Sequence, residues 1–406
     1  MRPLPVPRGA EVLTLLGPLE AVLHGRGEAL VPYAEDAAVP ALPAPEDDGG
    51  PGPEVPEGLA LAVGTSGSTG VAKRALLTAA NLLASATSTH DVLGGPGAWL
   101  LAMPAHHIAG LQVLVRSLVA GYRPAVTDAG PRFAATAFAG AVTRLPPGAE
   151  RRYTALVPAQ LSRLLEDERG VAALQGFDAV LVGGGATPPA LSSAAAAAGV
   201  RLVLTYGMSE TAGGCVYDGV ALPVSEVHID NEQHVVVGGS TVAHGYLGNP
   251  GLSADAFHTD SDGRRWFRTD DLGRLDGLGR LVIRGRADDL INTGGVKVAP
   301  GPVEDALVRY LPGVRDAVVV GAPDPDWGQA VCAALTLVPG VREPTLADVR
   351  AALRGILPDH SLPHRLLILD GLPERGPGKP DRAALTASFG GRARVDETMA
   401  ARQGEE

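Results

Sequence analysis

The sequence predicts an α/β protein with a large layered N-terminal domain and a smaller α+β C-terminal domain. Its 406 residues exceed the size at which a single hydrophobic core stops growing. Short apolar runs alternate with helical patterns over the first part of the chain, which is typical of parallel sheets covered by helices. From about residue 287 onward, two helical stripes and two strand-like runs fill a compact stretch. We therefore expect a large domain over residues 1–287 and a small domain over 288–406.

In the large domain, local signals place several elements. Residues 61–63 (LAV) predict a strand, and Thr78 is a suitable N-cap for a helix that runs through Leu82 and Leu83. Residues 180–182 (VLV) predict a buried strand that stops at a run of glycines. Strand 202–204 (LVL) follows after one further helix. Strand–helix–strand units at this density favour a layered core with largely parallel strands.

The helix between these two strands has clear start and stop signals. Thr187 is its predicted N-cap, and Pro188 and Pro189 would lie in its first turn, where a missing N–H costs nothing. Gly199 lies just past its expected end, a common place for glycine because the left-handed conformation suits it.

The predicted small domain contains two amphipathic helices and two strands. The first helical stripe consists of Val303, Ala306, Leu307, Tyr310 and Leu311. The second consists of Leu346, Val349, Leu353 and Ile356, with Thr345 as its cap. Residues 317–320 and 331–337 predict strands, and the polar stretch from about Phe389 is expected to be frayed.

Composition narrows the class of protein. Apolar residues make up 45% and charged residues 19%, as in a soluble globular protein. The formal net charge of −11 argues against a nucleic-acid partner. The two cysteines, Cys215 and Cys332, cannot build a disulfide framework. The first residues lack the apolar core of a signal peptide, and the uncharged stretch 179–200 is broken by glycines and two prolines. We therefore expect a cytoplasmic protein without a membrane span, and leave a homodimer open.

The segment 65–73 (TSGSTGVAK) is the most informative stretch of the chain. Glycines let the backbone approach an anion, while hydroxyls and free N–H groups can point at its oxygens. The predicted phosphate-binding residues are Thr65, Ser66, Gly67, Ser68, Thr69, Gly70 and Lys73. A Walker A loop would need Gly directly before the lysine and Ser or Thr after it, whereas Ala72 and Arg74 stand there. Taken alone, the segment could equally be a polar turn.

A second motif, 206–211 (YGMSET), comes shortly after strand 202–204. Ligands bind at the carboxyl ends of strands in α/β sheets. The ring of Tyr206 can stack on a nucleobase, the Ser209 hydroxyl can reach a phosphate, and the Glu210 carboxylate can hold Mg²⁺ beside it. By itself the hexapeptide could also be a surface turn.

Three further motifs complete a pattern that resembles the adenylate-forming superfamily of acyl-CoA ligases, luciferases and peptide-synthetase adenylation domains. They are 266–273 (WFRTDDLG), 285–297 (GRADDLINTGGVK) and 372–379 (LPERGPGK). The five motifs stand in the family's order from about residue 61 onward. The chain departs from the family's usual residues at Ala72, Arg74, Ser209 and Asp270, where Pro, Gly, Thr and Gly are common.

The resemblance implies roles for individual residues. Gly184, Gly185, Ala186, Tyr206 and Gly207 would bind the adenine and ribose. Asp271 would accept the ribose hydroxyls, and Arg286 would contact the nucleotide. Asp288 would be the hinge between domains, and Gly294 and Gly295 would form the loop on the CoA side. Lys379 would bridge the acyl carboxylate and the α-phosphate.

The implied reaction has two halves and uses ATP, Mg²⁺ and CoA. A carboxylate first attacks the α-phosphate of ATP, giving an acyl-adenylate and pyrophosphate, with charge neutralisation by Lys379, Mg²⁺ on Glu210 and the loop hydroxyls. The small domain then rotates about Asp288, which withdraws Lys379 and brings Gly294 and Gly295 to the site. The CoA thiol finally displaces AMP.

The segment 104–110 (PAHHIAG) and Arg116 bear on which acid is activated. The family's Pro-x-x-His-x-x-Gly motif places His107 beside the acyl pocket. Arg116 follows on an otherwise apolar stretch, 111–120, and burying an arginine is costly unless it meets an anion. The alternative is that Arg116 extends to solvent or pairs with an aspartate or glutamate.

The same features are similar to the o-succinylbenzoate–CoA ligases of menaquinone biosynthesis, in particular the actinobacterial branch. Supporting likenesses are the short N-terminal region and the run 205–217 (TYGMSETAGGCVY). That substrate is a dicarboxylate, so Arg116 would hold the aromatic carboxylate while the succinyl carboxylate is activated. Alternatives are a ligase for a monocarboxylate, an enzyme that loads a separate carrier protein, and a non-catalytic nucleotide-binding protein.

Overall fold

The computed structural model describes residues 1–42, 55–65, 73–127, 133–376 and 379–390. The chain forms two compact units. The large unit comprises Met1–Thr269 and Leu275–Val282, and the small unit comprises Asp270–Arg274 and Ile283–Glu406. The division falls within strands β15 (Arg265–Leu275) and β16 (Leu281–Arg286). The domain boundary expected after residue 287 stays a prediction.

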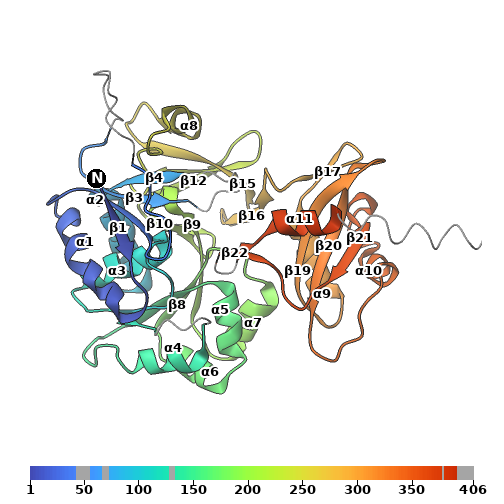
Figure 1. The fold of residues 1–406 in the computed structure, drawn as a ribbon, viewed down its shortest axis with the longest axis horizontal. Helices are drawn as coiled ribbons and strands as arrows, with labels where there is room; N and C mark the ends of the chain where they lie inside the picture. Colours follow the sequence, from blue (N-terminus) through green and yellow to red (C-terminus); the bar gives the residue numbers. More distant parts are fainter. Residues whose placement is uncertain (43–54, 66–72, 128–132, 377–378, 391–406) are drawn as a thin grey trace, which may run out of the picture. The chain divides into compact units, whose positions relative to one another are not determined.

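A seven-stranded sheet forms the centre of the large unit, in the order β11-β10-β9-β8-β7-β5-β6 (Figure 1). The strands from β6 to β9 pair in parallel, whereas β9, β10 and β11 pair antiparallel. This confirms the largely parallel α/β core. The strands are β5 (Ala98–Leu101), β6 (Ala125–Val126), β7 (Arg152–Leu156), β8 (Ala179–Val182), β9 (Leu202–Met208), β10 (Gly213–Tyr217) and β11 (Val220–Ala221).

Helices cover both faces of this sheet (Figure 1). On β5, Trp99 and Leu101 pack into the core shared with one helix group, while Ala98 and Leu100 pack into the core shared with the other. Successive side chains of a strand point to opposite faces, so a strand buried on both sides is apolar throughout. The first group is α1 (Leu16–Leu23), α2 (Ala79–Leu93) and α3 (Ile108–Ala120); the second is α4 (Ala135–Val142), α5 (Pro158–Leu165), α6 (Glu168–Leu174) and α7 (Pro189–Ala197).

A four-stranded sheet packs against the first helix group. It consists of β1 (Arg2–Val6), β2 (Leu30–Ala34), β3 (Leu59–Gly64) and β4 (Arg74–Thr78), with the 3₁₀ helix η1 (Gly9–Leu15) after β1. The strand predicted at 61–63 is therefore confirmed. Thr78 caps α2 as expected: its backbone N–H donates to Asn81 Oδ1 at 2.9 Å, and its hydroxyl oxygen accepts from Asn81 N at 3.2 Å. This is a capping box.

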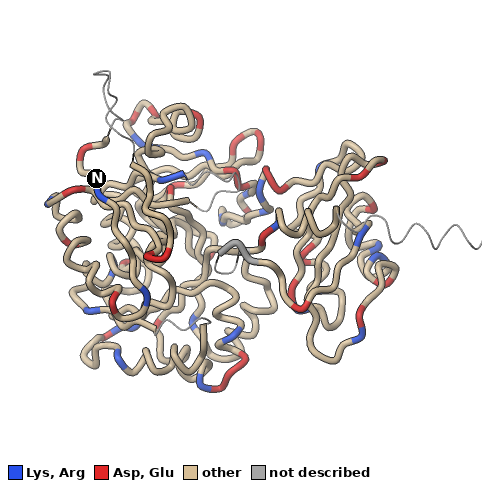
Figure 2. The backbone as a smooth tube through the Cα atoms, viewed as in Figure 1, with Lys and Arg blue, Asp and Glu red and all other residues tan. Residues whose placement is uncertain are grey.

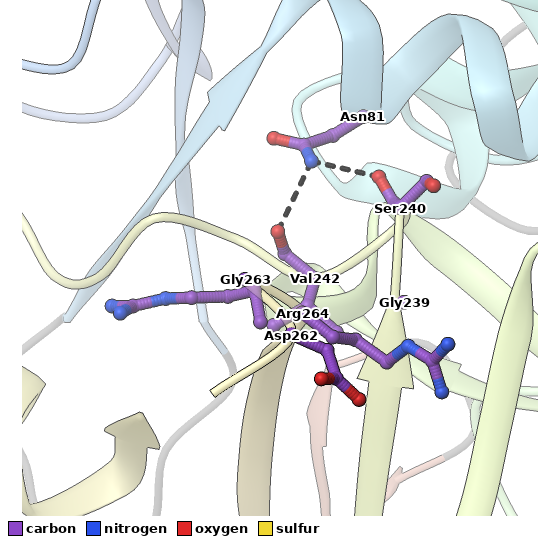
Figure 3. Close-up of a pocket in the computed structure, with 8 residues that line it drawn as sticks. Asn81, Gly239, Ser240, Val242, Asp262, Gly263 and Arg264 are labelled. Carbon is purple, nitrogen blue, oxygen red and sulfur yellow. Dashed lines mark hydrogen bonds between the residues drawn. The ribbon is translucent and has the colours of Figure 1, made fainter. Parts of the chain in front are cut away.

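A third sheet contains strands to which sequence analysis gave no assignment. Its order is β12-β13-β15-β14, and β16 also pairs with β15. A surface groove lies where this sheet meets the start of α2, and there Asn81 Nδ2 donates to the Ser240 and Val242 carbonyls (Figure 3). The residues lining the groove include no predicted site residue. The new elements are β12 (Ser225–Ile229), β13 (His234–Gly239), α8 (Pro250–Ala256) and β14 (Phe257–Thr259).

The small unit is an α+β module, as expected. Both predicted helices and both predicted strands are present: α9, α10, β19 and β20. Thr345 caps α10 through a capping box with Asp348. The sheet order is β18-β17-β20-β19, with β21 paired to β20. The elements are β17 (Ile291–Thr293), β18 (Val296–Val298), α9 (Pro300–Tyr310), β19 (Val314–Asp324), β20 (Gly328–Leu337), α10 (Leu346–Leu353), η3 (Asp359–Ser361), β21 (Arg365–Ile368), β22 (Glu374–Gly376), β23 (Lys379–Pro380) and α11 (Arg382–Gly390).

Two helix ends differ from expectation. The N-cap of α7 is Pro188 instead of Thr187, because a residue before proline is driven out of the helical region and Pro189 follows. The stripe that ends at Leu353 does not include Ile356, which is 43% exposed. Arg354 leaves the helix with ψ 130°, and Gly355 turns the chain at φ +81°.

Two further elements continue beyond the ends that the sequence predicted for them. Phe389 is 3% exposed because α11 continues to Gly390 and packs Phe389 with Leu385 and Leu367 into a core cluster. Strand β9 continues beyond Leu204 to Met208 because β10 returns beside it as an antiparallel partner.

Charged residues of both signs are interspersed along the described parts of each unit (Figure 2). Within the described ranges, no helix has the length and apolar composition needed to cross a membrane. Both cysteines are buried and unpaired. Burial raises the pKa of the Cys215 thiol to about 12, which makes it a poor nucleophile.

Candidate nucleotide and acyl-substrate site

The motif 206–211 forms a tight turn between β9 and β10. Tyr206 and Gly207 lie on β9, and the 3₁₀ helix η2 (Ser209–Thr211) follows. Thr211 Oγ1 accepts a hydrogen bond from Met208 N at 3.0 Å and donates to the Gly213 carbonyl at 2.8 Å. The hydrogen bonds of Thr211 fix this turn. The buried Glu210 side chain, 7% exposed, is therefore held at the carboxyl end of the sheet.

Ser209 connects this turn to the start of the predicted phosphate loop. Its hydroxyl donates to the carbonyl of Gly64, the last residue of β3, at 2.9 Å. At the base of the loop, Thr65 N donates to the Lys73 carbonyl at 2.8 Å. Thr65 Oγ1 is buried and has no hydrogen-bond partner among the described residues. The remaining predicted loop residues, Ser66, Gly67, Ser68, Thr69 and Gly70, lie outside the described residues.

Tyr246 is a site residue that sequence analysis missed. Its hydroxyl donates to Glu210 Oε1 at 2.9 Å, and Lys73 Nζ lies 5.5 Å from the centre of its ring. The segment around it is also fixed by backbone bonds, since Ala243 N donates to the Glu210 carbonyl at 2.8 Å and Leu247 N donates to the Arg74 carbonyl at 2.9 Å. These pairings join segments far apart in the chain, so no local pattern could have revealed them.

Glu210 suits Mg²⁺ that arrives with a nucleotide. Mg²⁺ prefers oxygen ligands and is usually held by one or two carboxylates together with substrate phosphates and water. Among the described residues, no cluster of three or more His, Cys, Asp or Glu side chains could form a cage made of protein alone. A buried carboxylate on a turn that is bonded to Gly64, at the start of the predicted phosphate loop, therefore fits the predicted metal role.

The residues predicted to bind adenine lie at the carboxyl ends of two adjacent strands of the sheet. Gly184, Gly185 and Ala186 follow β8, and Tyr206 lies near the end of the adjacent strand β9. The two strands pair in parallel up to Val182 and Leu204. Gly184 has φ +77°, a conformation that glycine adopts without strain. The structure thus brings the two predicted segments to the same strand ends.

In the small unit, the predicted nucleotide and hinge residues contact each other. Arg286 donates to both carboxylate oxygens of Asp288, at 2.8 and 2.9 Å. It also lies 3.3 Å from Asp270 and 3.7 Å from Asp271. Burial lowers the pKa of Arg286, but the hydrogen bonds and charge of Asp288, with Asp271 and Asp270, raise it above the usual arginine value overall. Arg286 is therefore a permanent cation among three carboxylates.

Gly294 and Gly295 form the turn of the β17–β18 hairpin, with φ +56° and +81°. Gly294 N donates to the Trp327 carbonyl at 2.9 Å, and a Cβ at Gly294 would lie 2.8 Å from the Trp327 ring. Lys379 lies on β23, where its backbone pairs with Gly376; its side chain lies outside the described residues. The hairpin that carries Lys379 leads directly into α11.

His107 and Arg116 lie on one helix but at different depths. His107 is the exposed N-cap residue of α3, and Arg116 lies nine residues later, which is roughly 13 Å of helical rise. Gly110 allows the helix to begin close to the preceding loop, because a Cβ there would lie 2.4 Å from the Pro104 carbonyl oxygen. His107 therefore lies exposed at the start of α3, and Arg116 lies in its buried part.

Arg116 is buried, with 3% exposure. Its Nη2 donates to Tyr217 Oη at 3.2 Å, its guanidinium lies 5.0 Å from the centre of the Trp99 ring, and its buried Nε has no partner among the described residues. Burial lowers its pKa, and Tyr217 opposes that shift. Within the described chain, the guanidinium neither reaches solvent nor lies within salt-bridge distance of a carboxylate.

Comparison with known proteins matches both halves of the chain to family models. Residues 19–247 match the model of the AMP-binding enzymes, and residues 302–379 match the model of the AMP-binding enzyme C-terminal domain. A probable 2-succinylbenzoate–CoA ligase from Mycobacterium tuberculosis is 46% identical over 397 residues, which cover 97% of this chain and all of that protein.

Solved structures are similar as well. An o-succinylbenzoate CoA synthetase from Bacillus subtilis, in complex with its acyl-adenylate intermediate, is 25% identical with a TM-score of 0.68, covering 92% of this chain and 80% of that one. ATP-bound MatB from Rhodopseudomonas palustris is 26% identical with a TM-score of 0.71, covering 82% and 68%. These structures share the arrangement of a larger N-terminal and a smaller C-terminal domain.

Gly207→Ala should abolish nucleotide binding. A Cβ at Gly207 would lie 2.0 Å from the Gly213 carbonyl oxygen, so strands β9 and β10 must separate and move Glu210 and Tyr206. ATP binding measured by calorimetry should become undetectable. Gly251→Ala in α8 is the control, because a Cβ there meets nothing within 4 Å. Unchanged ATP affinity in the Gly207 variant would contradict the geometry of this turn.

Proposed function

Because the chain belongs to the AMP-binding enzyme family, we propose that it is an o-succinylbenzoate–CoA ligase that acts in menaquinone biosynthesis. It is an AMP-forming acid–thiol ligase, and its reaction takes place in the cytoplasm, where ATP and CoA are supplied. The observation that supports this substrate is Arg116, a buried guanidinium whose Nε has no partner and which has no carboxylate within salt-bridge distance in the described chain. A buried cation is costly unless an anion pairs with it, and the second carboxylate of a dicarboxylate substrate would be that anion.

In the first half-reaction, the succinyl carboxylate attacks the α-phosphorus of ATP, and pyrophosphate leaves. The phosphate loop hydroxyls and Lys73 hold the phosphates, while Tyr206 and the turn at Gly184 hold the base. Glu210 would hold Mg²⁺, which would supply positive charge to neutralise the phosphates. The bond from Tyr246 fixes one Glu210 oxygen and so limits the directions in which that carboxylate can offer its remaining lone pairs.

Lys379 stabilises the charge that develops between the acyl carboxylate and the α-phosphate. In the second half-reaction, the CoA thiol loses its proton, attacks the acyl carbonyl and displaces AMP. Gly294 and Gly295 form the loop on the CoA side in this half-reaction. Rotation about Asp288 withdraws Lys379 from the site and brings this loop to it. The Arg286–Asp288 pair supports this assignment, since it ties the hinge carboxylate to the residue proposed to contact the nucleotide.

The proposal is tested first by measuring AMP formation in the presence of ATP and CoA. o-Succinylbenzoate is compared with monocarboxylates, including 4-oxo-4-phenylbutanoate, which lacks only the aromatic carboxylate. We expect at least a hundredfold preference in kcat/KM for the dicarboxylate, because the site otherwise leaves a buried cation unpaired. If the monocarboxylate is used equally well, the family assignment stands, but o-succinylbenzoate is not the specific substrate. Pyrophosphate release without thioester formation from CoA would favour an enzyme that loads a carrier protein.

Lys379→Ala should separate the two half-reactions. Removing a cation that acts only in the adenylation transition state is expected to slow pyrophosphate release by about a hundredfold or more. Thioester formation from supplied acyl-adenylate and CoA should remain within a few fold of the unchanged enzyme, and this half-reaction is the internal control. An equal loss in both halves would contradict the role of Lys379.

Arg116→Leu should weaken the use of o-succinylbenzoate without lowering the stability of the fold. The KM for o-succinylbenzoate is expected to rise by about a hundredfold, while turnover of 4-oxo-4-phenylbutanoate is unchanged. A buried charge without a counter-ion destabilises the fold through its desolvation, so the thermal unfolding midpoint should not fall when Leu replaces it. An unchanged KM for o-succinylbenzoate would show that Arg116 does not meet the substrate.

A further inference from the structure

We infer that Tyr217, supported by Thr89, is a positioning residue that fixes the direction of the Arg116 guanidinium and thereby determines selectivity for a dicarboxylate. This inference rests on the proposed function. Tyr217 does not touch the reacting atoms; it acts through Arg116. The three residues come from three elements that meet in the core of the large unit: Thr89 from α2, Arg116 from α3 and Tyr217 from the end of β10.

The hydrogen atoms in this chain of contacts can be assigned. The Thr89 hydroxyl donates its only hydrogen to the Ser85 carbonyl at 2.8 Å. The contact of 2.9 Å between Tyr217 Oη and Thr89 Oγ1 must therefore use the tyrosine hydrogen. Tyr217 Oη is left with its lone pairs facing Arg116 and accepts from Nη2 at 3.2 Å. A phenol whose hydrogen is committed elsewhere is an acceptor with a fixed direction.

The face of the guanidinium is also fixed. The guanidinium lies over the Trp99 ring, and Trp99 Nε1 donates to His90 Nε2 at 3.0 Å. Burial, with the nearby charge of Arg116, lowers the pKa of His90 to about 4, so at neutral pH the ring is uncharged and its hydrogen is on Nδ1. Tyr153 packs against Trp99 from another strand, with 5.1 Å between ring centres. The indole therefore cannot tilt freely under Arg116.

Donors remain unused after these contacts. Arg116 Nε and His90 Nδ1 are buried and lack hydrogen-bond partners among the described residues. Tyr217, Thr89, Trp99 and His90 together supply one acceptor to Arg116 and no negative charge. Leaving buried donors unmet is costly, and a carboxylate would satisfy the arginine with charge-assisted bonds. Tyr217 accepts from Nη2 of the guanidinium, and Nε is left for that carboxylate.

Tyr217→Phe removes the acceptor and keeps the ring. We expect the KM for o-succinylbenzoate to rise about tenfold, as loss of a bond to a charged group implies. The KM for ATP should be unchanged, and kcat at saturating acid should stay within about twofold. The KM for 4-oxo-4-phenylbutanoate should not change, because that acid lacks the aromatic carboxylate that Arg116 is proposed to bind. Steady-state kinetics with each acid gives all four values.

Tyr153→Phe is the matched control. It removes one phenolic hydroxyl from the same aromatic cluster, but that hydroxyl donates to the Leu93 and Gly95 carbonyls instead of contacting Arg116. A loss of stability alone should appear in both variants, whereas the rise in KM should appear only at Tyr217. The double variant Arg116→Leu/Tyr217→Phe should have the KM of Arg116→Leu alone, since two residues that act through one contact are not additive.

The outcomes separate this inference from the proposed function. If the unchanged enzyme prefers o-succinylbenzoate and Tyr217→Phe behaves like Tyr153→Phe, the role of Tyr217 is wrong and the proposed function stands. Additive effects in the double variant would overturn the role in the same way. If the unchanged enzyme shows no preference for the dicarboxylate, both the proposed function and the role of Tyr217 are overturned.

Discussion

The hydrogen-bonded junction around Glu210 is the constraint on which the large unit's site depends. Ser209 is bonded to the end of β3, the Glu210 carbonyl accepts from Ala243, and its carboxylate accepts from Tyr246. Two segments that are remote from this short turn in the sequence, the end of β3 and residues 243–246, therefore meet at it. A buried carboxylate is tolerated only when such bonds replace water, so the same contacts that stabilise the turn also aim the carboxylate.

Arg116 presents the opposite case, a buried charge whose contacts are incomplete. Its neighbours orient it through a phenol and an indole, and neither carries a negative charge. The large unit thus contains a fixed carboxylate suited to a cation and a fixed cation suited to a carboxylate. A dicarboxylate activated by Mg·ATP would satisfy both, and under the proposed function the packing of the core would then determine the choice of substrate.

Much of the fold follows from local signals. The capping boxes at Thr78 and Thr345 join residues that lie within one helical turn, and β3 and β8 are continuous apolar runs. Sequence spacing is therefore enough to predict these features. The misplaced limits at Thr187, Ile356 and Phe389 depend on a second proline, a glycine turn and a remote core contact. The antiparallel sheet β12–β15 was not predicted, because its pairing joins separate segments.

The sequence by itself determined the family, the two-domain α/β architecture and the residue types of the candidate site, because motif order and hydrophobic periodicity are local properties of the chain. The roles of those residues remain predictions. Only the tertiary structure decided that Tyr246 holds Glu210 and that Tyr217 and Trp99 contact Arg116, with His90 behind Trp99. Tyr246 and Glu210 are 36 residues apart along the chain, and Tyr217 and Arg116 are 101 residues apart. Nothing in local spacing encodes which remote hydroxyl a buried charge will meet.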